Sequence, residues 1–280
     1  MTVEAAAPGA GERGRVARHG PEVVKTHRAD TDPAALRVRV QVARWPGLGG
    51  VLLPPLAEPA VREGRLVTRW PYGEPVDQAV PERYPWAAAG ALLARLHAAP
   101  LAELPGPLPA AGGRQRLARA VRRLRGLPPE PRLGAARRLV LRAHRRPLPP
   151  PGRQPALCHG DFHLGQLVRA AGPPAGWRLI DIDDLGVGDP AWDLARPAAW
   201  YAAGLLPPED WQQLLAGYRL VEPDAAGAAG DPWPWLEGPA RALTVQSAAQ
   251  EVARAQLEAR QLSEAGVALV DACGRIAGLP

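Results

Sequence analysis

Short apolar runs separated by turn residues characterise the first 73 residues of the chain. The segments "RVAR" and "EVVKTH" flank the turn sequence "HGP", which predicts two short antiparallel strands. A helix is expected to start at Asp32 and Pro33, because aspartate caps helix N-termini and proline suits the first helical position. The apolar runs in "GGVLLPPL" and "GRLVTRWPYG" predict further strands. Residues 1–73 are therefore expected to form a small, mostly β unit with one helix, and the Ala- and Gly-rich residues 1–15 are expected to be mobile.

From residue 74 onward, apolar residues recur mainly at the 3.6-residue period of helices. The segment "WAAAGALLARLHAA" at 86–99 places apolar residues, among them Leu92, Leu93 and Leu96, on one face, so this helix is expected to lie in a core. The segments "RQRLARAVRRLRGL" and "RLGAARRLVLRAHRR" combine narrow apolar stripes with arginine. A short β region is predicted around 157–184. The helical segments "PAWDLARPAAWYAAGLL", "EDWQQLLAGYRLV" and "ARALTVQSAAQEVARAQLEAR" follow it.

The biased composition determines which single residues are informative about function. With 280 residues, 46% of them hydrophobic, the chain can bury a sizeable core. Of the 34 basic residues only Lys25 is a lysine, and the chain has no asparagine, so a residue type that escapes this bias is informative. The net charge of +6 invites an anionic partner. However, the arginines are spread along helical segments, which favours solvated helix faces over a nucleic-acid surface.

The cysteines and the hydropathy pattern indicate the compartment. Cys158 and Cys273 stand far apart without CxxC spacing, so a disulfide framework or a zinc site is not expected and a reducing cytoplasm is favoured. The chain shows neither the apolar core of a signal peptide nor a run of about 20 apolar residues. The sequence thus predicts a soluble cytoplasmic protein without a membrane partner.

The segment "LCHGDFHLGQ" at 157–166 concentrates the chemistry. Downstream of it, Leu167–Val168 and 177–180 predict a hairpin joined by the turn "AAGPPAG", which returns Asp181 to the point where the hairpin begins. Asp161, Gln166 and Asp181 are therefore expected to converge. Two carboxylates and an amide oxygen suit a hard divalent cation such as Mg²⁺, with one carboxylate free to accept a proton.

The interval of five residues between Asp161 and Gln166 is the one that protein kinases use between their catalytic aspartate and a metal-binding amide. In "HGDFHLGQ", "LIDIDD" and "GDPAWDLA" the chain resembles the aminoglycoside phosphotransferase family of kinase-like enzymes, and its "HLGQ" form is similar to maltokinase-type relatives. In the last segment the resemblance implies a helix capped by Asp189 with Pro190 at its first position. It also implies an α+β, bilobal, protein-kinase-like fold, with a small β-rich N-terminal lobe over 1–73 and a larger, mostly helical C-terminal lobe over 74–280.

The resemblance further implies a phosphotransferase that depends on ATP and Mg²⁺ and acts on a hydroxyl group of a small molecule. It assigns a role to each candidate residue in the C-terminal lobe: Asp161 as the catalytic base, Gln166 and Asp181 as metal ligands, Asp183 as a candidate second metal contact, and His159 and Asp193 as the scaffold of the catalytic loop.

In the N-terminal lobe the resemblance assigns nucleotide binding. Lys25 would contact the phosphates, and its survival as the only lysine supports this role independently, since a guanidinium does not replace a compact ammonium there. The backbone around Thr68, Arg69 and Trp70 would meet the adenine edge.

Three departures from the family pattern leave alternatives open. Gln166 replaces the usual asparagine, which alters the reach of the amide more than its chemistry. The helix after Lys25 has no glutamate to pair with the lysine, which leaves other acids as candidate partners: Asp30, Asp32, Glu58 and Glu63. The glycines of "GAGERG" at 9–14 precede a short strand and predict a weak phosphate-covering loop.

The acceptor is open among an aminoglycoside, another antibiotic and a sugar. The basic chain offers only scattered acids near its C-terminal end, which disfavours a polycation. His163 is ambiguous between a role near the acceptor and none, and three tryptophans are expected in the core with the acceptor pocket as the alternative: Trp192, Trp200 and Trp211. A different class of function is a catalytically silent kinase-like protein that docks an anionic partner through its arginine-rich surface.

Overall fold

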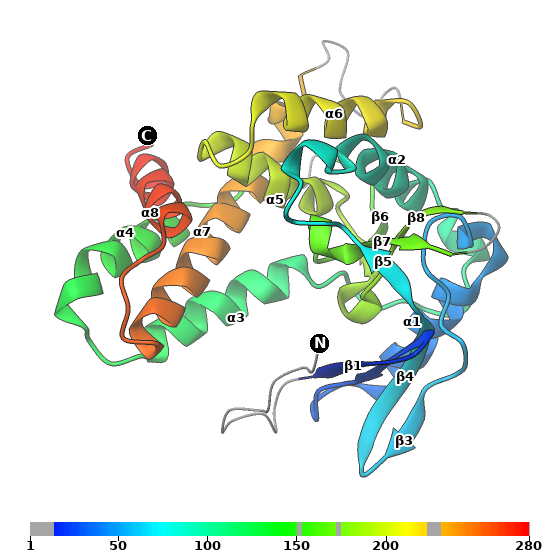
Figure 1. Ribbon diagram of the computed structural model, residues 1–280. Helices are drawn as coiled ribbons and strands as arrows, with labels where there is room; N and C mark the ends of the chain where they lie inside the picture. Colours follow the sequence, from blue (N-terminus) through cyan, green and yellow to red (C-terminus); the bar gives the residue numbers. More distant parts are fainter. Residues whose placement is uncertain (1–13, 150–152, 172–174, 223–230, 280) are drawn as a thin grey trace.

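The computed structural model describes residues 14–149, 153–171, 175–222 and 231–279 (Figure 1). Its N-terminal part is an antiparallel sheet in the order β1-β2-β4-β3, formed by β1 (Arg15–His19), β2 (Glu22–Thr26), β3 (Ala60–Arg62) and β4 (Arg65–Pro71). The predicted pair of strands around "HGP" is confirmed as β1 and β2. Two predictions concern the start of the chain: the mobility of residues 1–15 and the weak phosphate-covering loop at 9–14. Both fall mainly on residues 1–13, which lie outside the described ranges.

Helix α1 (Pro33–Arg44) begins where the sequence predicts, because the Asp32 carboxylate accepts hydrogen bonds from two backbone N–H groups of the first turn. The strand expected in "GGVLLPPL" at 49–56 is wrong. Two consecutive prolines in this run lack the N–H groups that a strand ladder needs. Only Leu52 makes an isolated parallel bridge, to Leu179, and the leucine is fully buried in the core.

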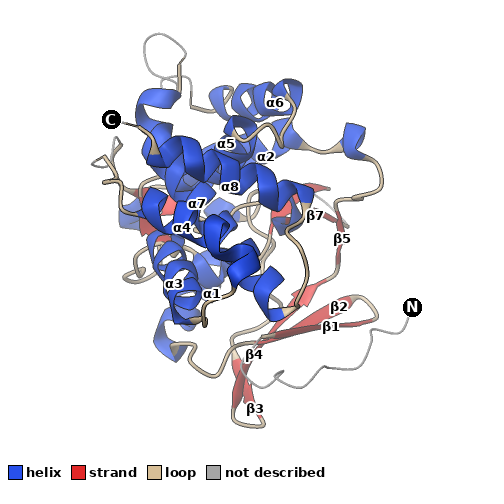
Figure 2. Ribbon diagram, turned by 90° about the vertical axis from the view of Figure 1, so that its left-hand side faces the viewer, coloured by secondary structure: helices blue, strands red, loops and turns tan. Residues whose placement is uncertain are grey.

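The larger part of the chain is mainly helical and carries two small sheets. Strands β5 (Gly73–Pro75), β7 (Leu167–Ala170) and β8 (Gly176–Leu179) form one sheet, and β6 (Ala156–Cys158) pairs with β9 (Gly186–Gly188). The helices are α2 (Trp86–His97), α3 (Gly113–Gly126), α4 (Gly134–His144), α5 (Ala191–Ala202), α6 (Pro208–Arg219), α7 (Trp233–Leu257) and α8 (Glu264–Ala277). The small sheet-containing part followed by a larger helical part confirms the expected α+β organisation. Figure 2 shows the sheet of β1 to β4 at one end of the molecule and the helices gathered over the rest.

Two clusters of buried apolar side chains hold the molecule together. One joins α2, α5 and α6 to the hairpin of β7 and β8 and to the segment around Leu52. The other surrounds α7, which packs against α3, α4, α5 and α8 (Figure 1). Helix α8 was not predicted from the sequence, although it buries an apolar stripe that includes Leu269, Val270 and Cys273.

Helices α2 and α6 approach each other closely because each has a glycine at the contact. A Cβ atom on Gly90 would lie 2.0 Å from the carbonyl oxygen of Leu214, and one on Gly217 would lie 1.9 Å from that of Ala87. Any larger residue would push the two backbones apart. This contact fixes α2, whose last residue, His97, reaches the catalytic loop.

Helix α5 begins at Ala191, one residue later than the sequence analysis expects, with Pro190 just before it. The Asp189 carboxylate accepts a hydrogen bond from the backbone N–H of Ala191 and so caps the helix nevertheless. Within the part of the chain that the structure describes, no helix combines the length and the apolar character needed to cross a membrane.

Candidate active site

The predicted hairpin is confirmed as β7 and β8, with Leu167 opposite Leu179. Its closing end brings Gln166 and Asp181 together: the Gln166 Nε2 atom lies 3.2 Å from Asp181 Oδ2, and the backbone N–H of Ile180 donates to the Gln166 carbonyl. Asp181 has a left-handed backbone conformation with φ of 65°. This turn directs the chain into the single-turn helix of 182–184, which carries Asp183 and Asp184.

Lys25 reaches this end of the hairpin from β2. Its Nζ atom lies 2.7 Å from Asp181 Oδ1 and 2.9 Å from Asp183 Oδ2. Burial opposes the charge on the ammonium, but the two carboxylates outweigh it and raise the pKa of Lys25. Burial likewise works against ionisation of Asp183, yet contacts with His27 and Lys25 hold the pKa of its carboxyl well below the usual range. The cluster is therefore ionised at neutral pH.

The acids considered from sequence as partners of Lys25 have other positions. Asp30 pairs with Arg28, Asp32 caps α1, and Glu58 pairs with Arg44, while Glu63 lies exposed in a left-handed turn. The structure replaces the missing helix glutamate with the two aspartates after β8. A lysine with two carboxylates needs no acid from α1.

His27 extends the cluster into the N-terminal sheet, and sequence analysis did not single it out. Its Nδ1 atom lies 3.3 Å from Asp183 Oδ1, and its Nε2 atom is 2.8 Å from Thr68 Oγ1. The Trp70 Nε1 group donates to the same hydroxyl. Thr68, Arg69 and Trp70 lie inside β4, paired with β2, so their backbone groups belong largely to the sheet. Of these three residues, only Thr68 is linked to the acidic cluster, through His27.

Asp161 lies between two arginines. Its Oδ1 atom is 2.5 Å from Arg196 Nη2 on α5, and its Oδ2 atom is 2.7 Å from Arg116 Nη2 on α3. Burial raises the pKa of Asp161, and the two guanidinium groups only partly offset this effect. Arg116 also contacts Asp184, with Nη1 2.7 Å from Oδ2. The same guanidinium thus bridges the catalytic loop and the residue that follows Asp183.

The expectation that the arginine-rich helices are merely solvated faces is wrong for Arg116. The segment before α3 is fixed against the acidic turn, since the Gly112 N–H donates to the Asp184 carbonyl. A Cβ atom on Gly112 would lie 1.9 Å from Asp184 Oδ1, so this approach requires glycine. The first turn of α3 therefore places Arg116 in the site. Sequence analysis missed Arg116 and Arg196 because the chain contains so many other arginines.

Asp193 holds the backbone of the catalytic loop. Its carboxylate accepts hydrogen bonds from the N–H groups of His159, at 2.6 Å, and Gly160, at 2.8 Å. His97 contacts the same carboxylate through Nε2 at 3.0 Å, and its Nδ1 atom is 2.7 Å from the Tyr218 hydroxyl. The His159 ring spans the loop in turn, with Nε2 2.8 Å from the Ile180 carbonyl. Sequence analysis missed His97, because a single histidine at a helix end carries no signal.

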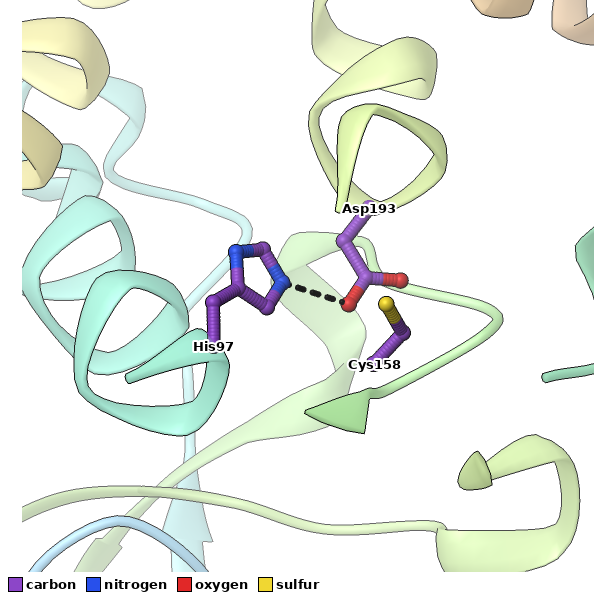
Figure 3. A group of neighbouring side chains, drawn as sticks. All are labelled: His97, Cys158 and Asp193. Atoms are coloured by element: carbon purple, nitrogen blue, oxygen red, sulfur yellow. Dashed lines mark hydrogen bonds and ion pairs between the residues drawn. The ribbon is translucent and has the colours of Figure 1, made fainter. Parts of the chain in front are cut away.

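Figure 3 shows that His97, Cys158 and Asp193 point toward one another. Their donor atoms lie within 4.8 Å of one another, as metal ligands do. Both ring nitrogens of His97 and both oxygens of Asp193 are already engaged in the hydrogen bonds above. Burial and the neighbouring carboxylates raise the pKa of the Cys158 thiol well above its usual value, which disfavours a metal-binding thiolate. His97 and Asp193 therefore form a hydrogen-bonded brace for the loop, and the Cys158 thiol beside them donates to the Ala156 carbonyl.

Oxygen ligands for a hard cation gather instead at Asp181 and Asp183, and the Gln166 amide lies beside them with its nitrogen toward Asp181 Oδ2. Carboxylate oxygens of both aspartates lie within 2.9 Å of the same ammonium nitrogen, so they converge on one position that favours positive charge. The Gln166 amide adjoins this position. Two carboxylates and an amide are the donor set that Mg²⁺ prefers.

Cavities flank the site on two sides. One, of about 370 Å³, lies between α1 and α3 and is lined by the acidic turn together with Arg39, Arg116 and Arg119. The other, of about 480 Å³, is lined by His163, Arg196 and residues of the chain after β5. The expectation that three tryptophans pack in the core is confirmed for Trp211, which stacks on Tyr201, and for Trp192, which also lines the recess around Asp161. Trp200 is partly buried against both core clusters and lines the larger cavity.

The phosphotransferase enzyme family matches the chain over residues 12–230, and the chain belongs to this family. No curated protein matches it. The fold is the kinase-like fold of this family, as similar solved structures show. This result confirms the family and the fold class expected from the sequence.

Three solved structures illustrate the likeness. A thermostable mutant of the aminoglycoside phosphotransferase APH(4)-Ia shares 15% identity, with 97% of this chain and 92% of that chain covered and a TM-score of 0.58. A choline/ethanolamine kinase family protein from Mesorhizobium loti shares 16% identity, with 96% and 87% covered and a TM-score of 0.55. The choline kinase LicA from Streptococcus pneumoniae shares 13% identity, with 99% and 93% covered and a TM-score of 0.55.

Proposed function

We propose that this protein transfers the γ-phosphoryl group of ATP to a hydroxyl group of a small molecule, with Mg²⁺ as the metal. The observation that carries the proposal is the convergence of Lys25, Asp181 and Asp183 beside the Gln166 amide, while Arg116 joins Asp161 to Asp184, the residue after Asp183. A phosphate-binding cation, a metal-binding donor set and a buried carboxylate are the parts that phosphoryl transfer needs.

In the proposed reaction the acceptor oxygen attacks the γ-phosphorus, the bond from that phosphorus to the bridging oxygen breaks, and ADP leaves. Asp161 orients the hydroxyl group and takes its proton at a carboxylate oxygen. Arg196 and Arg116 hold this carboxylate in place, while the Asp193 brace fixes the loop that carries it. Lys25 binds phosphate oxygens. Mg²⁺ held by Asp181 and Gln166, with Asp183 as a second contact, would neutralise phosphate charge.

Further support comes from the similar structures. APH(4)-Ia, 15% identical to this chain, has been solved in a ternary complex with ADP and hygromycin B. The missing helix glutamate no longer supports the catalytically silent alternative, because Lys25 has carboxylate partners although α1 supplies none. Its other argument, the weak phosphate-covering loop at 9–14, falls mainly outside the described residues. With its two cysteines buried and free, the protein is proposed to act in the cytoplasm.

Thermal unfolding with and without ATP and Mg²⁺ tests the proposal. Ligand at 100 times its Kd stabilises the native state by about 2.7 kcal/mol, which a melting curve resolves. Asp181→Ala should abolish the Mg²⁺-dependent part of the shift and the slow hydrolysis of ATP. Asp271→Ala, which removes an exposed carboxylate on α8, serves as the matched control and should keep both. Wild-type protein that shows no shift with ATP and Mg²⁺ would refute the proposal.

A further inference from the structure

The larger cavity, of about 480 Å³, lies beside the catalytic segment. Three stretches of chain line it: residues after β5 up to Trp86, the catalytic segment from His163 to Gly165, and α5 with the loop that follows it. These stretches are far apart in the sequence, so the cavity exists only in the folded molecule.

Arg196 connects this cavity to the chemistry. It lines the cavity, and its Nη2 atom contacts Asp161 Oδ1. It also lines the small recess in which Asp161 lies, together with Arg116. The cavity and the recess that holds Asp161 therefore meet at the Arg196 side chain, and a hydroxyl group in the cavity reaches the carboxylate when this guanidinium group moves aside.

The walls of the cavity carry little charge. Arg196 and Asp210 are the lining residues with a formal charge. The remaining lining side chains are mainly apolar or aromatic, among them Tyr84, Trp86, Leu164, Trp200, Leu205 and Leu206. A polycation in this cavity would lose its hydration and meet one carboxylate, an unfavourable exchange.

Two residues that line the cavity carry buried donors without hydrogen-bond partners. Among the described residues, nothing accepts a hydrogen bond from Trp86 Nε1 or from Arg196 Nε, and both residues line the cavity. Trp86 is only 3% exposed. An unsatisfied buried donor costs about 1–3 kcal/mol, so a ligand oxygen that accepts from either group would bind favourably.

We infer that this cavity is the acceptor site, and that the acceptor is an uncharged or singly charged hydroxyl compound with an apolar or aromatic face and oxygen atoms that accept hydrogen bonds. Polycationic aminoglycosides are excluded as preferred acceptors. The aromatic side chains would pack on the apolar face, Trp86 and Arg196 would donate to oxygen atoms, and Asp210 would tolerate one positive charge. The inference rests on the proposed phosphotransferase function.

A matched set of acceptors tests the inference. Phenyl β-D-glucoside and D-glucose offer similar sugar hydroxyl groups with and without an aromatic face, and hygromycin B is a polyamine. ADP formation with ATP and Mg²⁺ gives kcat/KM, mass spectrometry identifies the phosphorylated product, and calorimetry gives binding where turnover is slow. We expect phenyl β-D-glucoside to exceed both other compounds by about tenfold or more, the scale of discrimination by an apolar pocket. Equal or better use of D-glucose or hygromycin B would overturn the inference, as would absence of binding of phenyl β-D-glucoside at millimolar concentration.

Two variants test whether the residues that line the cavity cause the preference for phenyl β-D-glucoside. Trp200→Ala should remove most of the preference for phenyl β-D-glucoside while the KM for ATP stays unchanged. Trp177→Ala removes a partly buried tryptophan from β8, outside the cavity lining, and should keep the preference. Loss of the preference in both variants would contradict the assignment. Stabilisation by ATP and Mg²⁺ without any preference among acceptors would refute this inference alone, whereas absence of that stabilisation would refute the proposed function.

Discussion

Asp161→Asn removes the negative charge between Arg116 and Arg196 while it keeps the size of the side chain. The two contacts, at 2.7 and 2.5 Å, are charge-assisted. Arg116 would retain Asp184, but within the described residues Arg196 contacts no other carboxylate. However, burial raises the pKa of Asp161 in spite of both guanidinium groups, so folding favours the neutral carboxyl over the charged one, and the asparagine variant should have a Tm no lower than that of the wild type.

The same substitution should reduce kcat by about 10²–10⁴-fold, the usual contribution of a general base. In the wild-type protein burial raises the pKa of Asp161, so the acid limb of the kcat/KM profile should lie above the ordinary range of an aspartate, and Asp161→Asn should lack this limb. Coupled measurement of ADP release gives the rates, and thermal unfolding gives the Tm. Asp271→Asn, on the exposed face of α8, is the control for both and should resemble the wild type. Activity within tenfold of the wild type, or a Tm several degrees below that of the wild type, would refute the reasoning.

Three further predictions concern other parts of the molecule. Gln166→Asn should retain metal-dependent activity and Gln166→Ala should lose it, if the amide oxygen is the functional group. Arg260 contacts the Glu251 carboxylate with two nitrogens and holds its pKa at about 2, below the unfolded value of 4.5, so this contribution to stability is present above pH 4.5 and is lost as the pH falls toward 2. Glu251→Gln should therefore be less stable at pH 7 and should lose less stability over that range in acid titrations followed by circular dichroism. Gly217→Ala should cost about 1–3 kcal/mol in denaturant unfolding, because its Cβ atom would meet the backbone of α2. Gly126→Ala, with open space around the new atom, is its control.

Each of these predictions has an opposite outcome that would contradict it. Equal activity losses in the asparagine and alanine variants of Gln166 would mean that the amide does not bind metal. An acid titration of Glu251→Gln parallel to that of the wild type would assign the acid sensitivity to other carboxylates. Equal stability of the two glycine variants would show that α2 and α6 can separate at little cost.

The parts of the site that depend on local spacing could be predicted from the sequence. The hairpin follows from two apolar runs and a Gly/Pro turn, and it brings Gln166 to Asp181 regardless of the rest of the chain. The capped start of α1 is equally local. Such features depend on residues within about 20 positions of one another. Over that distance, turns and helix caps allow the backbone only a few arrangements.

The groups that complete the site come from distant segments. His27 and His97 are single residues in a sheet and at a helix end, and their partners are settled only when the segments pack. Arg116 lies 45 positions before Asp161 in a helix whose composition indicates exposure. The apolar run that contains Leu52 failed as a strand because burial in the core, rather than pairing, accounts for its hydrophobicity. The hydrophobic pattern of a segment indicates that its residues are buried, but it does not indicate which elements they pack against.

The lysine of this site has a consequence for chemical labelling. Because Lys25 is the only lysine in the chain, an amine-directed reagent that modifies an internal side chain can report on one position alone. In the structure its nitrogen is paired with two carboxylates and its side chain is only 15% exposed, so the proton that blocks acylation is held tightly. The rate of acylation of the peptide that contains Lys25, followed by its mass increment, therefore reports how often the aspartates release the ammonium group to solvent.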